Sequence, residues 1–260
     1  MNKKPFKIGW LSTGGGPGSY GLLKTVLDYI DNGELNIEIS FVFCNREKGQ
    51  DPQSDRFMNF INGRGINLLT LSSKKFRQTN HNAPWAQLRE HFDETVLRLI
   101  QPYKTDVIVN AGYMLIAPVL CEKMRMINIH PALPTGPIGM WKKVIWELID
   151  NRAIETGVMV HIVTKTVDGG PVLSFCRFPL RGELWDPLWE DIGNLTSDDL
   201  KIQLGESLPL FKAIRQEGIK RERMLLVETL NAISDRRVSL GQTSNYNTED
   251  FTSTIEASIT

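Results

Sequence analysis

Two kinds of hydrophobic pattern alternate along residues 6–178 of the chain. Short apolar runs closed by glycines or polar residues predict buried strands, and stretches with apolar residues every three or four positions predict amphipathic helices. The predicted strands are 6–12, 37–44, 67–71, 106–110, 125–130, 158–164 and 171–178, and the predicted helices are 19–29, 55–63, 84–101 and 140–151. This alternation predicts an α/β fold, a Rossmann-like, mostly parallel twisted sheet with helices on both faces.

The pattern changes after residue 180. Helical spacing continues over 197–216 and 222–233, whereas the stretch from Val238 is rich in Ser, Thr and Asn and holds few large apolar residues. We therefore expect three parts. They are an α/β domain over residues 1–180, a helical C-terminal extension over 181–237, and a flexible tail over 238–260.

Charge and composition narrow the class of protein. The 30 basic and 30 acidic side chains cancel, so no global attraction for nucleic acid or for an anionic membrane is expected. The apolar run near the start ends at Leu11, too short for a signal peptide or a membrane span. Cys44, Cys121 and Cys176 are odd in number and far apart, which is typical of reduced thiols. We expect a cytoplasmic protein.

A cluster of glycines separates the first predicted strand from the first predicted helix. Gly16-Pro-Gly-Ser-Tyr-Gly21 matches the spacing G-x-G-x-x-G, and backbone N–H groups at such a turn can bind a phosphate. No Lys-Ser or Lys-Thr pair follows, so the loop is not a P-loop. A dinucleotide is a second interpretation, because Arg46 follows the second strand where it would suit a 2′-phosphate. A turn without any ligand is the third.

Polar side chains gather at the ends of later strands. Asn128 and His130 lie two residues apart on one predicted strand, so both project to the same side of the sheet. An amide beside an imidazole can act as an oxyanion donor and a general base. His161 follows on the next strand, and Asp168 opens an Asp-Gly-Gly-Pro turn from which its carboxylate can orient an imidazole or hold water. Taken singly, His161 is a core histidine and Asp168 a turn former.

Two stretches, INIHPALP and GVMVHIVTKTVDGGPV, resemble the folate-dependent formyltransferases, most of all those that act on phosphoribosylglycinamide (GAR). The similarity extends over residues 6–180, which would be the catalytic domain. It implies that Asn128, His130 and Asp168 are catalytic. VNAGYMLIAP is similar to the segment that holds the pterin ring of 10-formyltetrahydrofolate in that family, and STGGGPGSY takes the place of the loop that binds the substrate phosphate.

The same resemblance implies roles for three further groups of residues. Binding of the substrate phosphate falls to Thr13, Gly14, Gly15, Gly16, Gly18, Ser19 and Tyr20. Folate binding falls to Tyr113, Met114, Leu115, Ile116 and Val167. Supporting roles fall to His161, Gly169, Gly170 and Glu206, the last as the acid that holds the substrate ribose.

For function, the resemblance implies formyl transfer from 10-formyltetrahydrofolate, as co-substrate, to the amine of GAR in purine biosynthesis. No metal is expected. The expected partners are the folate and a phosphorylated amine, with no nucleic acid and no membrane, and a homodimer is left open. Two alternatives stay open as well. One is another amine acceptor such as an aminosugar nucleotide, and the other, from a different class, is an NADP-binding oxidoreductase or binding module.

Overall fold

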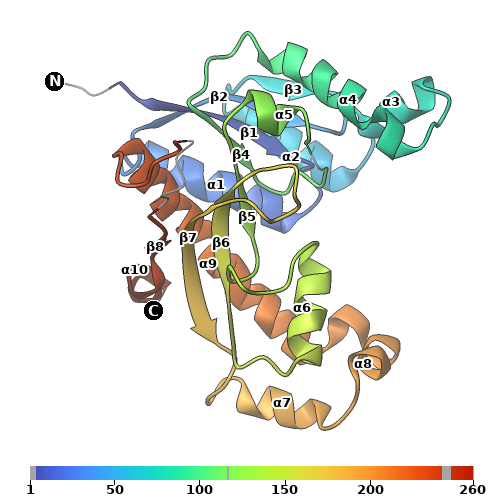
Figure 1. Ribbon diagram of the computed structural model, residues 1–260, viewed down its shortest axis with the longest axis vertical. Coiled ribbons are helices and arrows are strands. Elements are labelled where there is room, and N and C mark those ends of the chain that lie inside the picture. Colours follow the sequence, from blue (N-terminus) through green and yellow to red (C-terminus); the bar gives the residue numbers. More distant parts are fainter. Residues whose placement is uncertain (1–3, 116, 242–246, 260) are drawn as a thin grey trace. The chain divides into compact units, whose positions relative to one another are not determined.

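The structure is a computed structural model that describes residues 4–115, 117–241 and 247–259 (Figure 1). Its elements up to residue 130 are β1 (Phe6–Ser12), α1 (Pro17–Asp31), β2 (Ile37–Cys44), α2 (Pro52–Gly63), β3 (Leu68–Thr70), α3 (Ser73–Thr79), α4 (Trp85–Ile100), β4 (Val107–Asn110), α5 (Leu120–Lys123) and β5 (Met126–His130). The later elements are α6 (Trp141–Asp150), β6 (Glu155–Ile162), β7 (Val172–Pro179), α7 (Asp186–Ile192), α8 (Ser197–Gln203), the short 3-10 helix η1 (Gly205–Ser207), α9 (Pro209–Ser234), β8 (Glu249–Asp250) and α10 (Thr252–Ile259).

The strands follow the order β3-β2-β1-β4-β5-β6-β7-β8, which confirms the predicted α/β fold with a mostly parallel sheet. The chain also divides into two compact units. The first unit is Met1–Asn128, Ile162–Gly170 and Leu230–Leu240, and the second unit is Ile129–His161, Pro171–Thr229 and Gly241–Thr260. Each unit is built from separate segments of the chain, whereas the sequence predicted three continuous parts with boundaries at 180 and 237.

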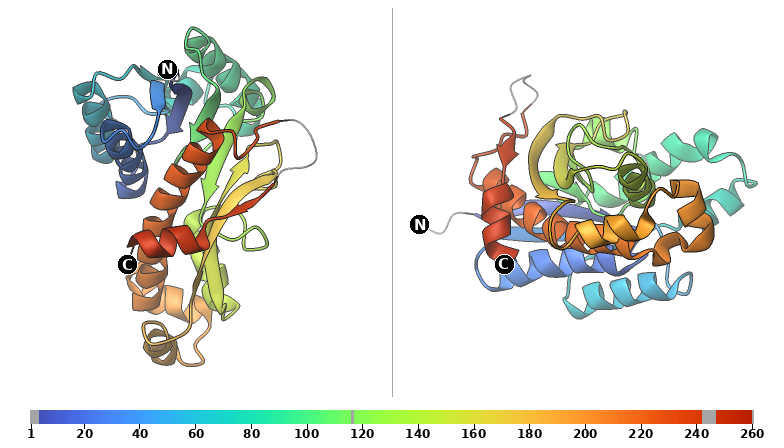
Figure 2. Two further views of the ribbon diagram at one scale, coloured as in Figure 1. Left: turned by 90° about the vertical axis from the view of Figure 1, so that its left-hand side faces the viewer. Right: turned by 90° about the horizontal axis from the view of Figure 1, so that it is seen from below.

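The first unit is a parallel sheet between helices. β1 pairs in parallel with both β2 and β4, and β4 pairs in parallel with β5. Apolar side chains of α4, among them Phe92 and Val96, pack on Phe41, Phe43 and Ile108 of the strands. In Figure 2, α1 and α2 lie on the opposite face of these strands from α4. The short buried runs and the amphipathic helices of the sequence are thus explained, because a sheet covered on both faces offers its strands no exposed side.

The second unit packs helices on an antiparallel pair of strands. β6 and β7 pair antiparallel, with Val158 opposite Cys176. The apolar face of α6 contributes Val144 and Leu148 to a core that also holds Phe211 of α9 and side chains of β7, α7 and α8. The helix spacing of the sequence is therefore explained by burial of one face against this core.

The helical part after residue 196 differs from the prediction. The expected helices 197–216 and 222–233 are replaced by α8, η1 and the continuous 26-residue α9. The break falls at Gly205, whose φ is 52°, and α9 then begins with Pro209, a residue that fits the first turn of a helix. Gly218 stays inside α9, because a long helix packed on a core tolerates one glycine at a cost of about 1 kcal/mol.

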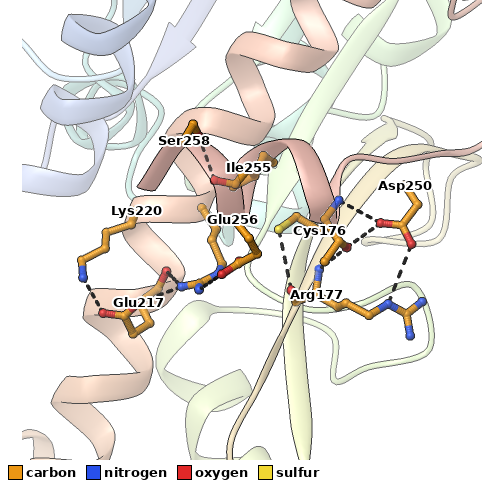
Figure 3. Close-up of polar contacts among 10 residues, drawn as sticks. Cys176, Arg177, Glu217, Lys220, Asp250, Ile255, Glu256 and Ser258 are labelled. Carbon is orange, nitrogen blue, oxygen red and sulfur yellow. Dashed lines mark hydrogen bonds and ion pairs between the residues drawn. The ribbon is translucent and has the colours of Figure 1, made fainter. Parts of the chain in front are cut away.

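The last residues differ more strongly from the expected flexible tail. Residues 242–246 lie outside the described residues, but β8 pairs in parallel with β7 and α10 follows it. Phe251 and Ile255 are buried. Glu256 of α10, which Figure 3 labels, forms a two-bond ion pair with Arg221 of α9. A few apolar anchors and one buried cation thus hold this polar segment, which composition alone does not reveal.

Candidate functional site

The glycine loop joins β1 to α1 by a sharp turn. Gly14 has a φ of 61°, and a Cβ at this position would lie 2.7 Å from the ring of Phe57. Both observations require glycine. Pro17 begins α1, and the first turn of the helix carries no acidic residue. Because the first N–H groups of a helix have no partner within it, this turn presents donors and a positive dipole end to an anion.

Thr13 ties the glycine loop to the segment after β4. Its backbone N–H donates to the carbonyl of Gly112 at 2.9 Å, and its Oγ1 accepts from the N–H of Met114 at 3.2 Å. A Cβ at Gly112 would lie 2.2 Å from Oγ of Ser19. The structure therefore brings together two segments that the sequence analysis assigned to different ligands.

The ring of Tyr20 is engaged by side chains of α2. The ring packs on Phe60 of α2, with centroids 4.9 Å apart, and the guanidinium of Arg56 lies over it at 5.0 Å. The phosphate-binding role predicted for Tyr20 can thus involve its backbone, while its ring braces α1 against α2.

The predicted folate segment shows two kinds of side chain. Met114 is 49% exposed and Val167 is 44% exposed, so both side chains present apolar surface that a ligand could contact. Leu115 is half-buried, and Ile116 lies outside the described residues. Tyr113 differs, because its ring is buried in the first unit's core beside Phe43 and offers no open surface.

A buried carboxylate of α4 holds the backbone just after this segment. The carboxylate of Asp93 on α4 accepts from the N–H of Val119 at 3.1 Å. Burial raises the pKa of Asp93, and the nearby charge of Arg89 opposes that rise. Burial also raises the pKa of Tyr113 far above its ordinary value, so the phenol stays neutral.

Two of the three predicted catalytic residues meet in the first unit. Asn128 stands beside Asn110 in the register of β5 and β4, and its Nδ2 donates to Oδ1 of Asp168 at 3.4 Å. Asp168 has a φ of 50°, a conformation that costs free energy for a residue with a side chain. Strain of this kind is common where a structure holds a functional group in place.

The two glycines after Asp168 permit its turn. A Cβ at Gly170 would lie 1.8 Å from the carbonyl oxygen of Ile162, and one at Gly169 would lie 2.7 Å from the side chain of Thr166. The chain passes too close to itself at these positions for any other residue. Both glycines therefore allow the turn through close contacts, and their supporting role stays a prediction.

His130 and His161 belong to the second unit, and both are buried at 2% exposure. Nε2 of His130 lies 2.9 Å from the carbonyl oxygen of Pro137. A carbonyl cannot donate, so Nε2 carries the hydrogen, and in the neutral ring Nδ1 carries the lone pair. His161 stands opposite Val172 in the register of β6 and β7, in keeping with a supporting role from within the sheet.

Glu206, the acid expected to hold a ribose, lies in η1 of the second unit. Its carboxylate forms a close ion pair with Nζ of Lys142 on α6, and both side chains are about half exposed. The sequence analysis did not single out Lys142. No motif marks it, because only the packing of α6 near η1 brings the two charges together.

A cavity of about 390 Å³ lies in the first unit. We call it the β2-end cavity, and it is lined by Thr13, Asn45, Arg46, Gln50, Asp51, Ser73, Lys74 and Met114. Thr13 and Met114 were predicted site residues, and Arg46 was considered for a 2′-phosphate. Asn45 and Lys74 were missed, although Asn45 directly follows the second predicted strand, where ligand-binding residues of α/β sheets lie.

Two absences can be stated for the described part of the chain. It contains no group of three or more His, Cys, Asp and Glu side chains placed to hold a metal ion. None of the helices in residues 4–115, 117–241 and 247–259 is both long and apolar enough to cross a membrane.

Comparison with known proteins gives a consistent family. The profile of the family described as formyl transferase matches residues 16–180. A phosphoribosylglycinamide formyltransferase of Dictyostelium discoideum is 26% identical over 169 residues, which are 61% of this chain and 78% of the relative. The enzyme of the same name from Escherichia coli (strain K12) is 34% identical over 95 residues, which are 35% of this chain and 44% of the relative. This chain thus matches less than half of the E. coli protein's length.

Solved structures agree at the level of the fold. Glycinamide ribonucleotide transformylase 1 from Symbiobacterium toebii has a TM-score of 0.67 at 19% identity, covering 93% of each chain. A formyltetrahydrofolate deformylase from Pseudomonas syringae has a TM-score of 0.63 at 19% identity, covering 93% of this chain and 65% of the other.

Proposed function

The chain belongs to the formyl transferase family, and from this premise we propose that it transfers a formyl group from 10-formyltetrahydrofolate to the amine of GAR, a step of purine biosynthesis. The observation that carries the proposal is the Asn128–Asp168 pair, held at 3.4 Å by a strained turn. The relatives named phosphoribosylglycinamide formyltransferase support GAR as the acceptor.

The proposed reaction has three features that the chain must serve. The acceptor amine attacks the formyl carbon, negative charge builds on the formyl oxygen, and the amine loses a proton. The amide of Asn128 and the protonated ring of His130 stabilise the oxyanion, and one well-placed donor is worth about 3 kcal/mol. Asp168, through water, takes the proton from the amine. His130 gives its proton to N10 of the folate as the bond between the formyl carbon and N10 breaks, so the net proton transfer is from the amine to N10. The exposed Met114 and Val167 suit the apolar face of the folate.

A spectrophotometric assay with 10-formyltetrahydrofolate and GAR tests the proposal. We expect turnover by the native chain and a loss of several orders of magnitude in His130→Ala and in Asp168→Asn, with the fold intact by circular dichroism. His91→Ala is the matched control, because His91 is exposed on α4. Near-native turnover in both site variants would show that these residues are not catalytic.

The choice of acceptor is tested in the same assay with a panel of aminosugar nucleotides. Turnover with one of these and none with GAR would favour the aminosugar alternative. Stabilisation of the chain against heat by NADPH and not by a folate analogue would favour the dinucleotide alternative.

A further inference from the structure

One carboxylate interrupts the apolar face that α4 buries. The buried residues of this helix are Leu88, Phe92, Asp93, Val96 and Ile100, and Asp93 is 0% exposed. Burial of a carboxylate costs free energy that burial of an apolar side chain does not. Packing therefore does not explain Asp93, and the explanation must lie in the bonds that its carboxylate makes.

The carboxylate binds the backbone that follows the predicted folate segment, residues 113–116. Its Oδ2 accepts from the N–H of Val119 at 3.1 Å and from that of Leu120 at 3.5 Å. Val119 is the N-cap of α5 and Leu120 is its first residue, and the first N–H groups of a helix have no partner within it. Asp93 thus supplies the acceptor that the start of α5 lacks.

Arg89 balances the charge of Asp93 from one turn earlier on α4. Burial shifts the pKa of both side chains toward the neutral form, and each charge opposes the shift of the other, so the two groups lie close together. Oδ1 of Asp93 and Nε and Nη2 of Arg89 are buried without a hydrogen-bond partner in the described part of the chain. Within that part, the hydrogen bonds to the carboxylate therefore come from the backbone that precedes and opens α5.

The predicted folate segment lies in a stretch without regular structure. The described residues of 111–119 form neither helix nor strand, and the hydrogen bonds that tie this stretch to distant residues lie near its two ends. At the first end Thr13 bonds to Gly112 and Met114, and at the far end Asp93 bonds to Val119. A binding loop depends on a rigid scaffold for its conformation. When one anchor is lost, a ligand must order the loop as it binds, which weakens its affinity.

We propose that Asp93, balanced by Arg89, is a positioning residue that sets the affinity for the folate by fixing the far end of the folate segment. The inference rests on the proposed function, because the folate role of this segment is part of that function. Asp93 has no exposed surface, so it touches no ligand and acts through the backbone at Val119.

Two substitutions at Asp93 separate the hydrogen bond from the charge. Asp93→Asn and Asp93→Ala both remove the negative charge, but only the asparagine keeps an oxygen that can accept from Val119. Calorimetric titration of the full chain with 5-formyltetrahydrofolate, a stable isomer of the co-substrate, measures the affinity of each variant. We expect Asp93→Ala to bind at least about tenfold more weakly than Asp93→Asn, the worth of one such bond. Equal affinity in the two variants would overturn the proposal.

A double variant keeps the test decisive if Asp93→Ala does not fold. Arg89→Met combined with Asp93→Leu leaves no buried charge, and apolar replacement of a buried ion pair is often neutral or stabilising. This variant should therefore fold, yet it has no acceptor for the N–H of Val119. We expect it to bind 5-formyltetrahydrofolate about tenfold more weakly than the native chain. Native affinity would show that Asp93 serves stability alone and would overturn the proposal.

Asp106→Ala is the matched control. Asp106 also accepts from a backbone N–H, that of Lys7 at 2.8 Å, but it is exposed and precedes β4, so its loss leaves the affinity for 5-formyltetrahydrofolate native. In the formyl-transfer assay, Asp93→Ala should raise the KM for the folate and leave the KM for GAR unchanged. A loss confined to kcat would contradict the proposal, because it would place the effect after binding.

The titration and the formyl-transfer assay distinguish the failure of this inference from that of the proposed function. A chain that loses folate affinity in Asp93→Ala but does not formylate GAR would refute the proposed function alone. A chain that formylates GAR and binds the folate equally well in Asp93→Ala and Asp93→Asn would refute this inference alone.

Discussion

Gly170→Ala tests how the turn of Asp168 is held. The added Cβ would lie 1.8 Å from the carbonyl oxygen of Ile162 and 2.9 Å from its carbon, and contacts under 3.0 Å are essentially never seen. Both are backbone atoms, so the segment must move by more than 1 Å. Overpacking of this kind costs about 1–3 kcal/mol or more. The shift also breaks the 3.4 Å bond between Asn128 and Asp168, and a misplacement of about 1 Å can cost about 100-fold in rate.

The same substitution at Gly218 is the matched control. Apart from the neighbouring residues and the backbone of α9 itself, no atom of the described residues lies within 4 Å of a Cβ there. The position is inside α9, so Gly218→Ala stabilises the chain by about 0.5–1 kcal/mol. Urea unfolding measures the free energy of unfolding of both variants, and the formyl-transfer assay measures their turnover. Native stability and turnover in Gly170→Ala, or an equal loss in both variants, would refute the reasoning.

Three further predictions concern stability and reactivity. Ile255→Ala should lower the free energy of unfolding by about 2–5 kcal/mol in urea, because the side chain is fully buried; a change near zero would show that α10 contributes little. Asp51 has a lowered pKa because it accepts from a backbone N–H, so its stabilisation is present above the unfolded pKa of about 3.9 and is lost as the pH falls through the folded pKa. In Asp51→Asn, the midpoint of urea unfolding should therefore fall less steeply as the pH is lowered than in the native chain. The same dependence of the midpoint on pH in both proteins would contradict this prediction. Iodoacetamide should label Cys121 first, because Cys44 and Cys176 are fully buried and burial raises the pKa of Cys44 to about 11 and of Cys176 to about 12. Mass spectrometry measures the order of labelling, and faster labelling of Cys44 or Cys176 than of Cys121 would contradict the prediction.

Local pattern was enough to predict most of the first unit. The apolar runs that become β1 and β2 start and end where expected, because the buried part of a strand covered on both faces is largely apolar. The sequence also indicated a tight turn at the DGGP motif, whereas the close approach of the Ile162 backbone that leaves no room for a side chain at Gly170 is visible only in the structure. Asn128 and Asp168 were predicted from a motif, and their separation of 40 positions gave no measure of the distance between them.

Contacts between distant segments decided what the sequence left open. Tyr20 was predicted to bind a phosphate, and the structure adds that its ring packs on Phe60 of α2. Glu206 was expected to hold a ribose and is paired with Lys142 from another helix. The polar end of the chain was expected to be flexible, yet Phe251 and Ile255 find buried positions. In each case the partner is remote in sequence, so no local pattern contains it.

The sequence by itself determined the α/β fold, the order of the strands along the chain and the types of residue at their ends. Hydrophobic period and glycine placement are local properties that each segment carries with it. The tertiary structure alone decided which polar groups share a space. The β2-end cavity joins residues that follow β1, β2, β3 and β4, and these residues share one space only once those strand ends are packed side by side.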